Sequence, residues 1–331
     1  MFDVPVVLFV FKRRKALKVL EQIRKVQPKK IYILADYGRN ESEKKQCDVL
    51  RKEIEDSIDW ECEVVKRYAE ANIGVFYNIG LGAKWVLERE DKAIFLEDDN
   101  YPEETFFSYC KDMLEKYENN PQVLWVCGTN YLIDYKNKEN TDVVFTRHLL
   151  PCGWASWSHK FNKYYDAYLE HYNDCDKKVL SLYKPKALGK QFARCWADEK
   201  YRIDNNELPK SWDYQMDFTL KYYNMFGVAP CKNQIRNIGA DEDSIHGGNS
   251  LNKEMTNRFC ENETVPMKFP ITTPMEINID SIYERKVGRV MLLPLKDRIK
   301  YQISIIIRKV FNIPKQYRIV DYFKSKAYKQ K

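Results

Sequence analysis

Apolar runs alternate with amphipathic helical patterns along the first 128 residues, and this alternation constrains the fold more than any other feature of the chain. The candidate strands are VVLFVF at 6–11, KIYILA before Asp36, ECEVVK at 61–66, AIFL at 93–96 and VLWVC at 123–127. Helical periodicity lies between them, as at 77–89 and 103–118. Alternation of this kind favours a parallel sheet with crossover helices on both faces. The pattern predicts an α/β fold with a doubly wound, mostly parallel sheet.

Three consecutive acids, Glu97, Asp98 and Asp99, directly follow the fourth of these runs. Ligands of parallel sheets bind beyond the carboxyl ends of the strands. Adjacent carboxylates repel one another unless a positive charge lies between them, and Mg²⁺ or Mn²⁺ shares its coordination between carboxylates and phosphate oxygens. We therefore predict a divalent metal at these acids. The alternative is a solvated turn, because EDDN is also good turn sequence.

Two more charged residues follow predicted strands at the same edge. Arg13 lies in a run of four cations at 12–15, which is unfavourable at the start of a helix unless an anion lies nearby. Asp36 ends the second strand and is expected to accept hydrogen bonds from a nucleotide base or ribose. The alternatives are a solvated helix start for Arg13 and an ordinary turn or cap for Asp36.

A separate carboxylate in the second half is a candidate general base. Asp213 follows Trp212 at the expected start of a helix, where partial shielding from water raises a carboxyl pKa towards a useful value. A helix cap is the alternative, and Asp217, one turn later, is the second choice. His246 lies in the polar segment GADEDSIHGGNS and is expected to contact a metal or phosphate, with a surface histidine as the alternative.

Composition indicates a globular protein, and the cysteines indicate the cellular compartment. The chain has 331 residues, 44% of them hydrophobic, which can fill a sizeable core. Its nine cysteines contain no CxxC pair, which favours free thiols in a reducing compartment. The N-terminus lacks the features of a signal peptide, and no apolar stretch reaches the length of a membrane span. We expect a cytoplasmic protein of bacterial type.

Several segments in order resemble the GT-A glycosyltransferases, in particular the branch of N-acetylglucosaminyltransferase I and bacterial enzymes of capsule and lipopolysaccharide assembly. They are PVVLFVFKR, DYGR, FLEDDN with PEETFFSY, LPCGWASWSHKF, PKSWDYQMDF and NIGADEDSIHGG, and they span roughly residues 4–250. The resemblance implies a Rossmann-like GT-A domain at 1–284. Its nucleotide-binding half would cover about 1–128 and its acceptor-binding half about 129–284.

The resemblance also implies a role for each matching residue. Arg13 would contact the nucleotide, Asp36 a uracil ring, and Glu97 and Asp98 the donor. Asp99 would bind Mn²⁺ or Mg²⁺ directly, and His246 would add a late metal or phosphate contact. Gly153 and Trp154 would line the donor sugar. Asp213 would deprotonate an acceptor hydroxyl for in-line attack, so that the reaction inverts configuration.

The last 47 residues, 285–331, form a basic tail. They hold fourteen Lys and Arg against two acids, a net charge of +12, whereas the whole chain carries +7 and residues 1–284 therefore carry −5. Apolar residues recur at helical spacing over 295–310, as in a helix that lies on an anionic membrane. The alternatives are a helix that packs on the body with its basic face outward, and nucleic-acid binding. The acidic body and the lack of a nucleic-acid module count against the latter.

Together these features predict an inverting, metal-dependent glycosyltransferase. It would move a sugar from a nucleotide-diphosphate donor, such as a UDP-sugar, to a glycan or polyprenyl-diphosphate-linked acceptor at the inner face of the membrane. One alternative is a sugar-phosphate nucleotidyltransferase, although FKRRKALK lacks the glycine-rich phosphate loop expected after the first strand. The other is a non-catalytic membrane-bound scaffold that binds sugar or lipid.

Overall fold

The computed structural model of the chain describes residues 1–173, 177–240, 254–313, 319, 320, 322 and 323. It divides into two compact units, Met1–Met291 and Leu292–Lys331. The division falls after α10 (Ser281–Met291), whereas the sequence suggested a boundary at 284/285, inside that helix. Tyr283 and Val287 of α10 are buried in the core of the first unit, which explains why the whole helix belongs to it.

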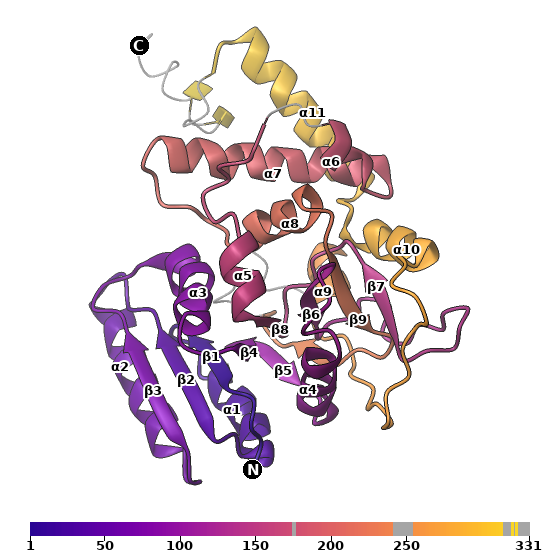
Figure 1. Cartoon of the computed structure of the whole chain (residues 1–331). Helices are drawn as coiled ribbons and strands as arrows, with labels where there is room; N and C mark the ends of the chain where they lie inside the picture. The colour runs from indigo at the N-terminus through magenta and orange to yellow at the C-terminus, as the bar shows by residue number, and fades with distance from the viewer. Residues whose placement is uncertain (174–176, 241–253, 314–318, 321, 324–331) are drawn as a thin grey trace. The chain divides into compact units, whose positions relative to one another are not determined.

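The first four strands form the predicted parallel sheet (Figure 1). Their order is β3-β2-β1-β4, and each pairs with its neighbour in parallel. The bounds are β1 Val6–Val10, β2 Lys30–Ala35, β3 Glu63–Tyr68 and β4 Lys92–Glu97. β1, all of β2 but its first residue and all but the ends of β4 are buried, because helices cover both faces of the sheet. The predicted α/β arrangement, a parallel sheet with crossover helices, is confirmed for this half of the sheet.

Beyond β4 the sheet becomes mixed, which the strand pattern alone did not predict. It continues as β8-β6-β9-β7, in which only β6 and β9 pair in parallel. Gly128, directly after β6, donates its N–H to the carbonyl of Gly153, directly before β8, over 2.7 Å. β8 therefore begins at the edge where β6 ends and has to run the opposite way. The bounds are β6 Val123–Cys127, β7 Val143–Thr146, β8 Trp154–Trp157 and β9 Phe226–Pro230.

Helices on the two faces of the sheet enclose two hydrophobic cores. α1 (Lys15–Val26), α2 (Glu41–Asp56) and α4 (Thr105–Lys116) bury their apolar faces in one core. The other core takes α3 (Leu81–Leu87), α5 (Ser158–Tyr164) and α8 (Asp213–Tyr222). The helix expected at 77–89 begins as one π-helical turn at Phe76–Gly80. This two-sided cover leaves the strand ends as the place for a site.

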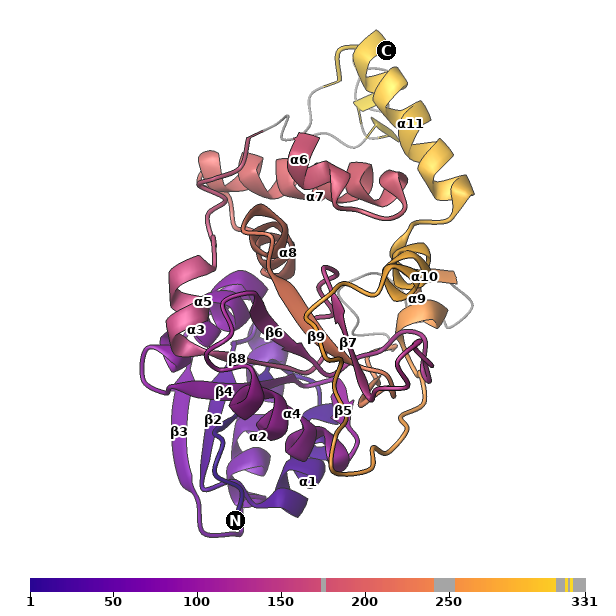
Figure 2. The same ribbon diagram turned by 45° about the vertical axis from the view of Figure 1, so that its right-hand side comes forward.

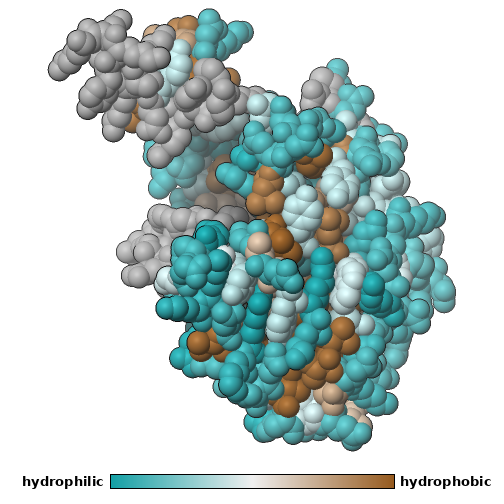
Figure 3. Space-filling view, turned by 90° about the vertical axis from the view of Figure 1, so that its left-hand side faces the viewer, coloured by the Kyte–Doolittle hydropathy of each residue, from teal (hydrophilic) through white to brown (hydrophobic). Residues whose placement is uncertain are grey.

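Further helices flank the mixed end of the sheet. α7 (Lys186–Asp204) packs against α8, and α10 contacts both α7 and β7 (Figure 2). The short helices α6 (Lys177–Ser181) and α9 (Glu254–Phe259) complete the first unit. At the other end, hydrophilic residues predominate on the face that carries α2 and β3 (Figure 3). Charged residues on such an edge strand discourage pairing with another chain.

The second unit contains α11 (Leu295–Val310), an amphipathic helix of 16 residues. Within the described part of the chain, the helices are all too short or too polar to cross a lipid bilayer.

Candidate active site

Glu97 is the last residue of β4, and Asp98 and Asp99 form a two-residue turn to the short strand β5 (Asn100–Pro102). We call these three acids the acidic turn. β4 lies near the centre of the sheet, next to β1, and ends at Glu97. β5 pairs with β10 (Ile235–Asn237) in a separate two-stranded sheet. The acidic turn therefore lies at the carboxyl edge of the parallel strands, where the sequence analysis expected it.

Arg13 meets the acidic turn although 86 residues separate it from Asp99. Its Nη1 donates to Asp99 Oδ2 over 2.8 Å and lies 3.4 Å from Asp98 Oδ1. The side chains of Arg13, Asp98 and Asp99 are only 12–15% exposed, so water screens these charges weakly. Parallel pairing of β1 with β4 produces the contact, because the segments after both strands leave the sheet at one edge.

Electrostatics at the acidic turn favour a bound cation. Burial raises the pKa of Glu97 well above its ordinary value, and the charges of Asp99, Asp98 and Asp213 add to this effect, while Arg13 acts in the opposite direction. A carboxylate that neighbouring carboxylates push towards protonation gains from any added positive charge. The contribution of Asp213 also means that the expected base and the acidic turn lie within electrostatic reach of each other.

Asn100 connects the acidic turn to the loop before β8. Its amide donates to Asp99 Oδ1 over 2.8 Å, and its carbonyl oxygen accepts the N–H of Gly153 over 2.8 Å. Gly153 has φ +61°, and a Cβ there would lie 2.4 Å from Ile235 Cδ1, so any side chain at 153 would strain the backbone and displace Ile235. The sequence analysis missed Asn100 as a site residue, although it follows the acids directly in EDDN.

The side chain of Trp154 lies in the core. Its ring is 1% exposed and stacks between Phe95 and Trp125, with 4.0 Å between centroids on each side. This differs from the expectation that Trp154 lines a donor sugar. The physical reason is strand alternation, since the first residue of β8 points into the aromatic core that α5 and α8 cover. Only the backbone at Gly153 is left to line a sugar.

Asp36 organises a neighbouring loop. Its Oδ1 accepts the N–H groups of Tyr37 and Ile73, both over 2.8 Å, and its Oδ2 accepts the N–H of Gly74 and the amide of Asn72. A carboxylate with four protein donors is close to saturated. The uracil contact expected for Asp36 stays a prediction, and the loop at 72–74 is what the carboxylate holds in this structure.

Asp213 begins α8, as the sequence analysis expected, and is partly buried. The hydroxyl of Ser211 donates to its Oδ1 over 2.6 Å and accepts the N–H of Tyr214 over 2.9 Å. Burial raises the pKa of Tyr131, and the charge of Asp213 is among the further causes. Tyr131 is thus a second residue near the site that the sequence analysis did not single out.

A glycine lets the chain pack directly against Asp99. A Cβ on Gly239 would lie 2.2 Å from Asp99 Oδ2. The neighbouring Ile238 donates its N–H to the backbone carbonyl of Asp99 over 2.8 Å, and its own carbonyl accepts from the ammonium of Lys15. The backbone of 238–239 therefore forms one wall of the acidic turn. His246, seven residues further on, lies outside the described residues.

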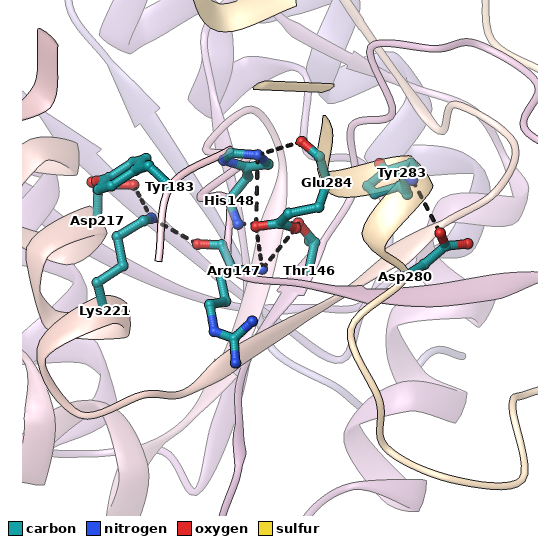
Figure 4. A network of polar contacts seen from close by, with 9 residues as sticks. All are labelled: Thr146, Arg147, His148, Tyr183, Asp217, Lys221, Asp280, Tyr283 and Glu284. Atoms are coloured by element: carbon teal, nitrogen blue, oxygen red, sulfur yellow. Dashed lines mark hydrogen bonds and ion pairs between the residues drawn. The ribbon is translucent and has the colours of Figure 1, made fainter. Parts of the chain in front are cut away.

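Asp217, the second choice for the base, is committed to a buried network (Figure 4). It forms an ion pair with Lys221 and accepts from the hydroxyl of Tyr183. Lys221 also donates to the carbonyl of Arg147 over 2.7 Å. Nearby, Glu284 accepts from Thr146, and its backbone carbonyl lies 2.8 Å from His148 Nε2. With its partners inside the core, Asp217 has no path to a substrate hydroxyl.

The acidic turn fits a divalent ion of the kind that phosphates help to bind. Oxygens of Asp98 and Asp99 converge on one guanidinium nitrogen, and hard cations such as Mg²⁺ prefer this donor type. No group of three or more His, Cys, Asp or Glu side chains in the described ranges is arranged to hold a metal by itself. One or two carboxylates with donor phosphates are the composition that Mg²⁺ sites commonly show.

Comparison with known proteins gives only distant likenesses. No protein-family model matches the chain, and no curated protein matches its sequence. Solved structures similar to it include a UDP-glucose pyrophosphorylase with UDP-glucose (9% identity, 70% of this chain and 92% of that one, TM-score 0.34) and mouse xyloside xylosyltransferase 1 (12%, 67% and 83%, 0.34). Another is a mannosyltransferase from Pyrobaculum calidifontis with GDP-Man and Mn²⁺ (7%, 67% and 71%, 0.33). These neighbours are enzymes that use nucleotide sugars, and at such TM-scores their likeness carries no argument about this chain.

Proposed function

We propose that this protein is an inverting, divalent-metal-dependent glycosyltransferase that uses a nucleotide-diphosphate sugar, with a UDP-sugar as the first donor to test. The observation that carries the proposal is the pair of separate acidic elements at one edge of the sheet. The acidic turn follows β4, and Asp213 begins α8 within its electrostatic reach. Transfer from a nucleotide sugar needs both a place for the diphosphate charge and a carboxylate for the acceptor.

The chemistry follows from these positions. Asp213 takes the proton of an acceptor hydroxyl, whose oxygen attacks the anomeric carbon as the bond to the diphosphate breaks. Arg13 draws the diphosphate towards the carboxyl edge of the sheet, and Asn100 holds Asp99 and the Gly153 loop in register. When bound at Asp98 and Asp99, with His246 as a further predicted ligand, Mn²⁺ or Mg²⁺ would neutralise the charge that develops on the leaving group.

The acceptor is proposed to be a glycan or a polyprenyl-diphosphate-linked sugar in bacterial surface polysaccharide synthesis, such as that of a capsule. Such an acceptor would meet the enzyme in the cytoplasm, at the inner face of the cell membrane. Support comes from the basic tail, and from the division of the chain into a catalytic unit and a second unit that contains α11.

The test is transfer from a panel of nucleotide sugars, with and without Mn²⁺. Activity should be lost in EDTA and return with Mn²⁺, and Asp99→Ala should lower it about 10²–10³-fold, as for loss of one charge-stabilising group. Asp213→Asn should bind the donor normally and transfer about 10²–10⁴-fold more slowly. Full activity in chelator, or normal transfer by Asp213→Asn, would contradict the proposal.

The same assay separates the alternatives. A sugar-phosphate nucleotidyltransferase would release nucleoside triphosphate when given pyrophosphate and the nucleotide sugar. A non-catalytic scaffold would bind the sugar or lipid but turn over neither. The segment between β1 and α1, residues 11–14, contains no glycine, which favours transfer over nucleotidyl chemistry.

A further inference from the structure

α11 has an exposed apolar face. Its stripe consists of five residues that are 49–66% exposed: Leu295, Ile299, Ile303, Ile306 and Val310. They follow one another at intervals of four, four, three and four residues, and this spacing places them on one side of α11, the helix labelled in Figure 2. A contiguous exposed apolar stripe of this kind marks an interaction surface.

Basic residues border the stripe on both sides. At 100° per residue, Lys296 and Lys300 fall along one flank, and Arg298 and Lys309 along the other. Asp297, the one acid of the helix, lies on the far side, 3.9 Å from Lys300. Long basic side chains beside an apolar stripe can reach anionic groups while their stems cover apolar surface. The helix thus offers one face with two chemistries, an apolar centre and cationic borders.

The positive charge of the second unit indicates which kind of partner the apolar stripe binds. Residues 292–331 hold eleven Lys and Arg against two acids, a net charge of +9. A second copy would bring an equal positive charge to the same face, which is unfavourable. A nucleic acid would match the charge but leave the stripe in water. An anionic bilayer satisfies both, and with about 24 Å of length α11 can lie along its surface.

We propose that α11 binds the interface of an anionic lipid bilayer, with its apolar stripe among the acyl chains and its flanking lysines at the headgroups. The binding is independent of the chemistry at the acidic turn, so a failure of either proposal leaves the other standing. It brings the protein to the surface where lipid-linked molecules lie.

The test is flotation of the full chain with vesicles of phosphatidylcholine and phosphatidylglycerol, compared with phosphatidylcholine alone. The protein should float with the anionic vesicles and be released by high salt. Ile306→Glu should lower partitioning about tenfold or more. Val49→Glu is the matched control, since Val49 is a similarly exposed residue of α2 and the charge change is the same. It should float like the unmodified chain.

A triple change of Lys296, Lys300 and Lys309 to Gln should lower partitioning about a hundredfold, from about fivefold for each cation. Equal flotation of Ile306→Glu and the unmodified chain would overturn the proposal, as would equal binding to both vesicle types. So would a dimer in vesicle-free solution that Ile306→Glu dissociates, because the stripe would then cover a second copy of the chain.

Discussion

Two polar clusters lie one helical turn apart on α8 and differ in how their charges are balanced. Asp213, at the start of the helix, belongs with the acidic turn, where burial and then the charges of Asp99, Asp98 and Asp213 raise the pKa of Glu97. Asp217 lies in the core, where Lys221 and Tyr183 bind both of its oxygens. The first cluster gains from an added cation, and the second already contains its own. We therefore assign the proposed chemistry to the first cluster and a structural role to the second.

The largest difference should appear in stability when each aspartate is removed. Asp217→Ala leaves the buried Lys221 without its counter-ion and should lower the free energy of unfolding by about 3–5 kcal/mol. Asp213→Ala removes a carboxylate at a helix N-terminus and should cost about 1 kcal/mol or less. Chemical denaturation of both variants measures this. Equal costs would mean that the two clusters do not differ in kind.

A second substitution changes only the geometry of the acidic turn. In Gly239→Ala the new methyl group would collide with Asp99 Oδ2 and push that carboxylate away from Arg13. We expect transfer to fall about a hundredfold, as for a displacement of about 1 Å at a reacting centre. Steady-state kinetics measure the fall, and circular dichroism checks the fold. Unchanged kinetics would show that the position of Asp99 does not matter.

The side chain of Asn100 links the acidic turn to the loop before β8, so removing that side chain should also lower the stability of the protein. Asn100→Ala leaves the N–H of Gly153 without its acceptor and should lower the free energy of unfolding by about 1–3 kcal/mol. Asn119→Ala, in an exposed turn after α4, is the matched control and should cost about 0.5 kcal/mol or less. If both variants lose the same amount, Asn100 does not hold the site together.

The smallest effect concerns pH. Because the pKa of Glu97 is raised above 4.5 in the folded protein, its contribution to stability is complete below that pH. The contribution is lost as pH rises through the raised pKa. Glu97→Gln should remove this loss and stabilise the metal-free protein at neutral pH by about 1 kcal/mol. Unfolding curves across the acidic to neutral range test this, and parallel pH profiles for the two proteins would contradict it.

Local pattern was sufficient for the parallel half of the fold. The four strands β1 to β4, their crossover helices and the start of α8 at Asp213 all follow from apolar runs and turn residues. The mixed half was not predictable in this way, because the direction of β8 depends on the contact between Gly128 and Gly153. The pairing of Asp217 with Lys221 had a signal, an acid and a lysine four residues apart on one helix.

The sequence by itself determined that acids follow a buried strand, that a separate carboxylate begins a later helix, and that the tail is basic and amphipathic. These are properties of neighbouring residues, and the chain carries them into any fold. Only the tertiary structure decided that Arg13 lies against Asp99 and that Trp154 belongs to the core. Such outcomes depend on contacts between segments that are far apart in the sequence. The local pattern of a strand or helix does not specify those contacts.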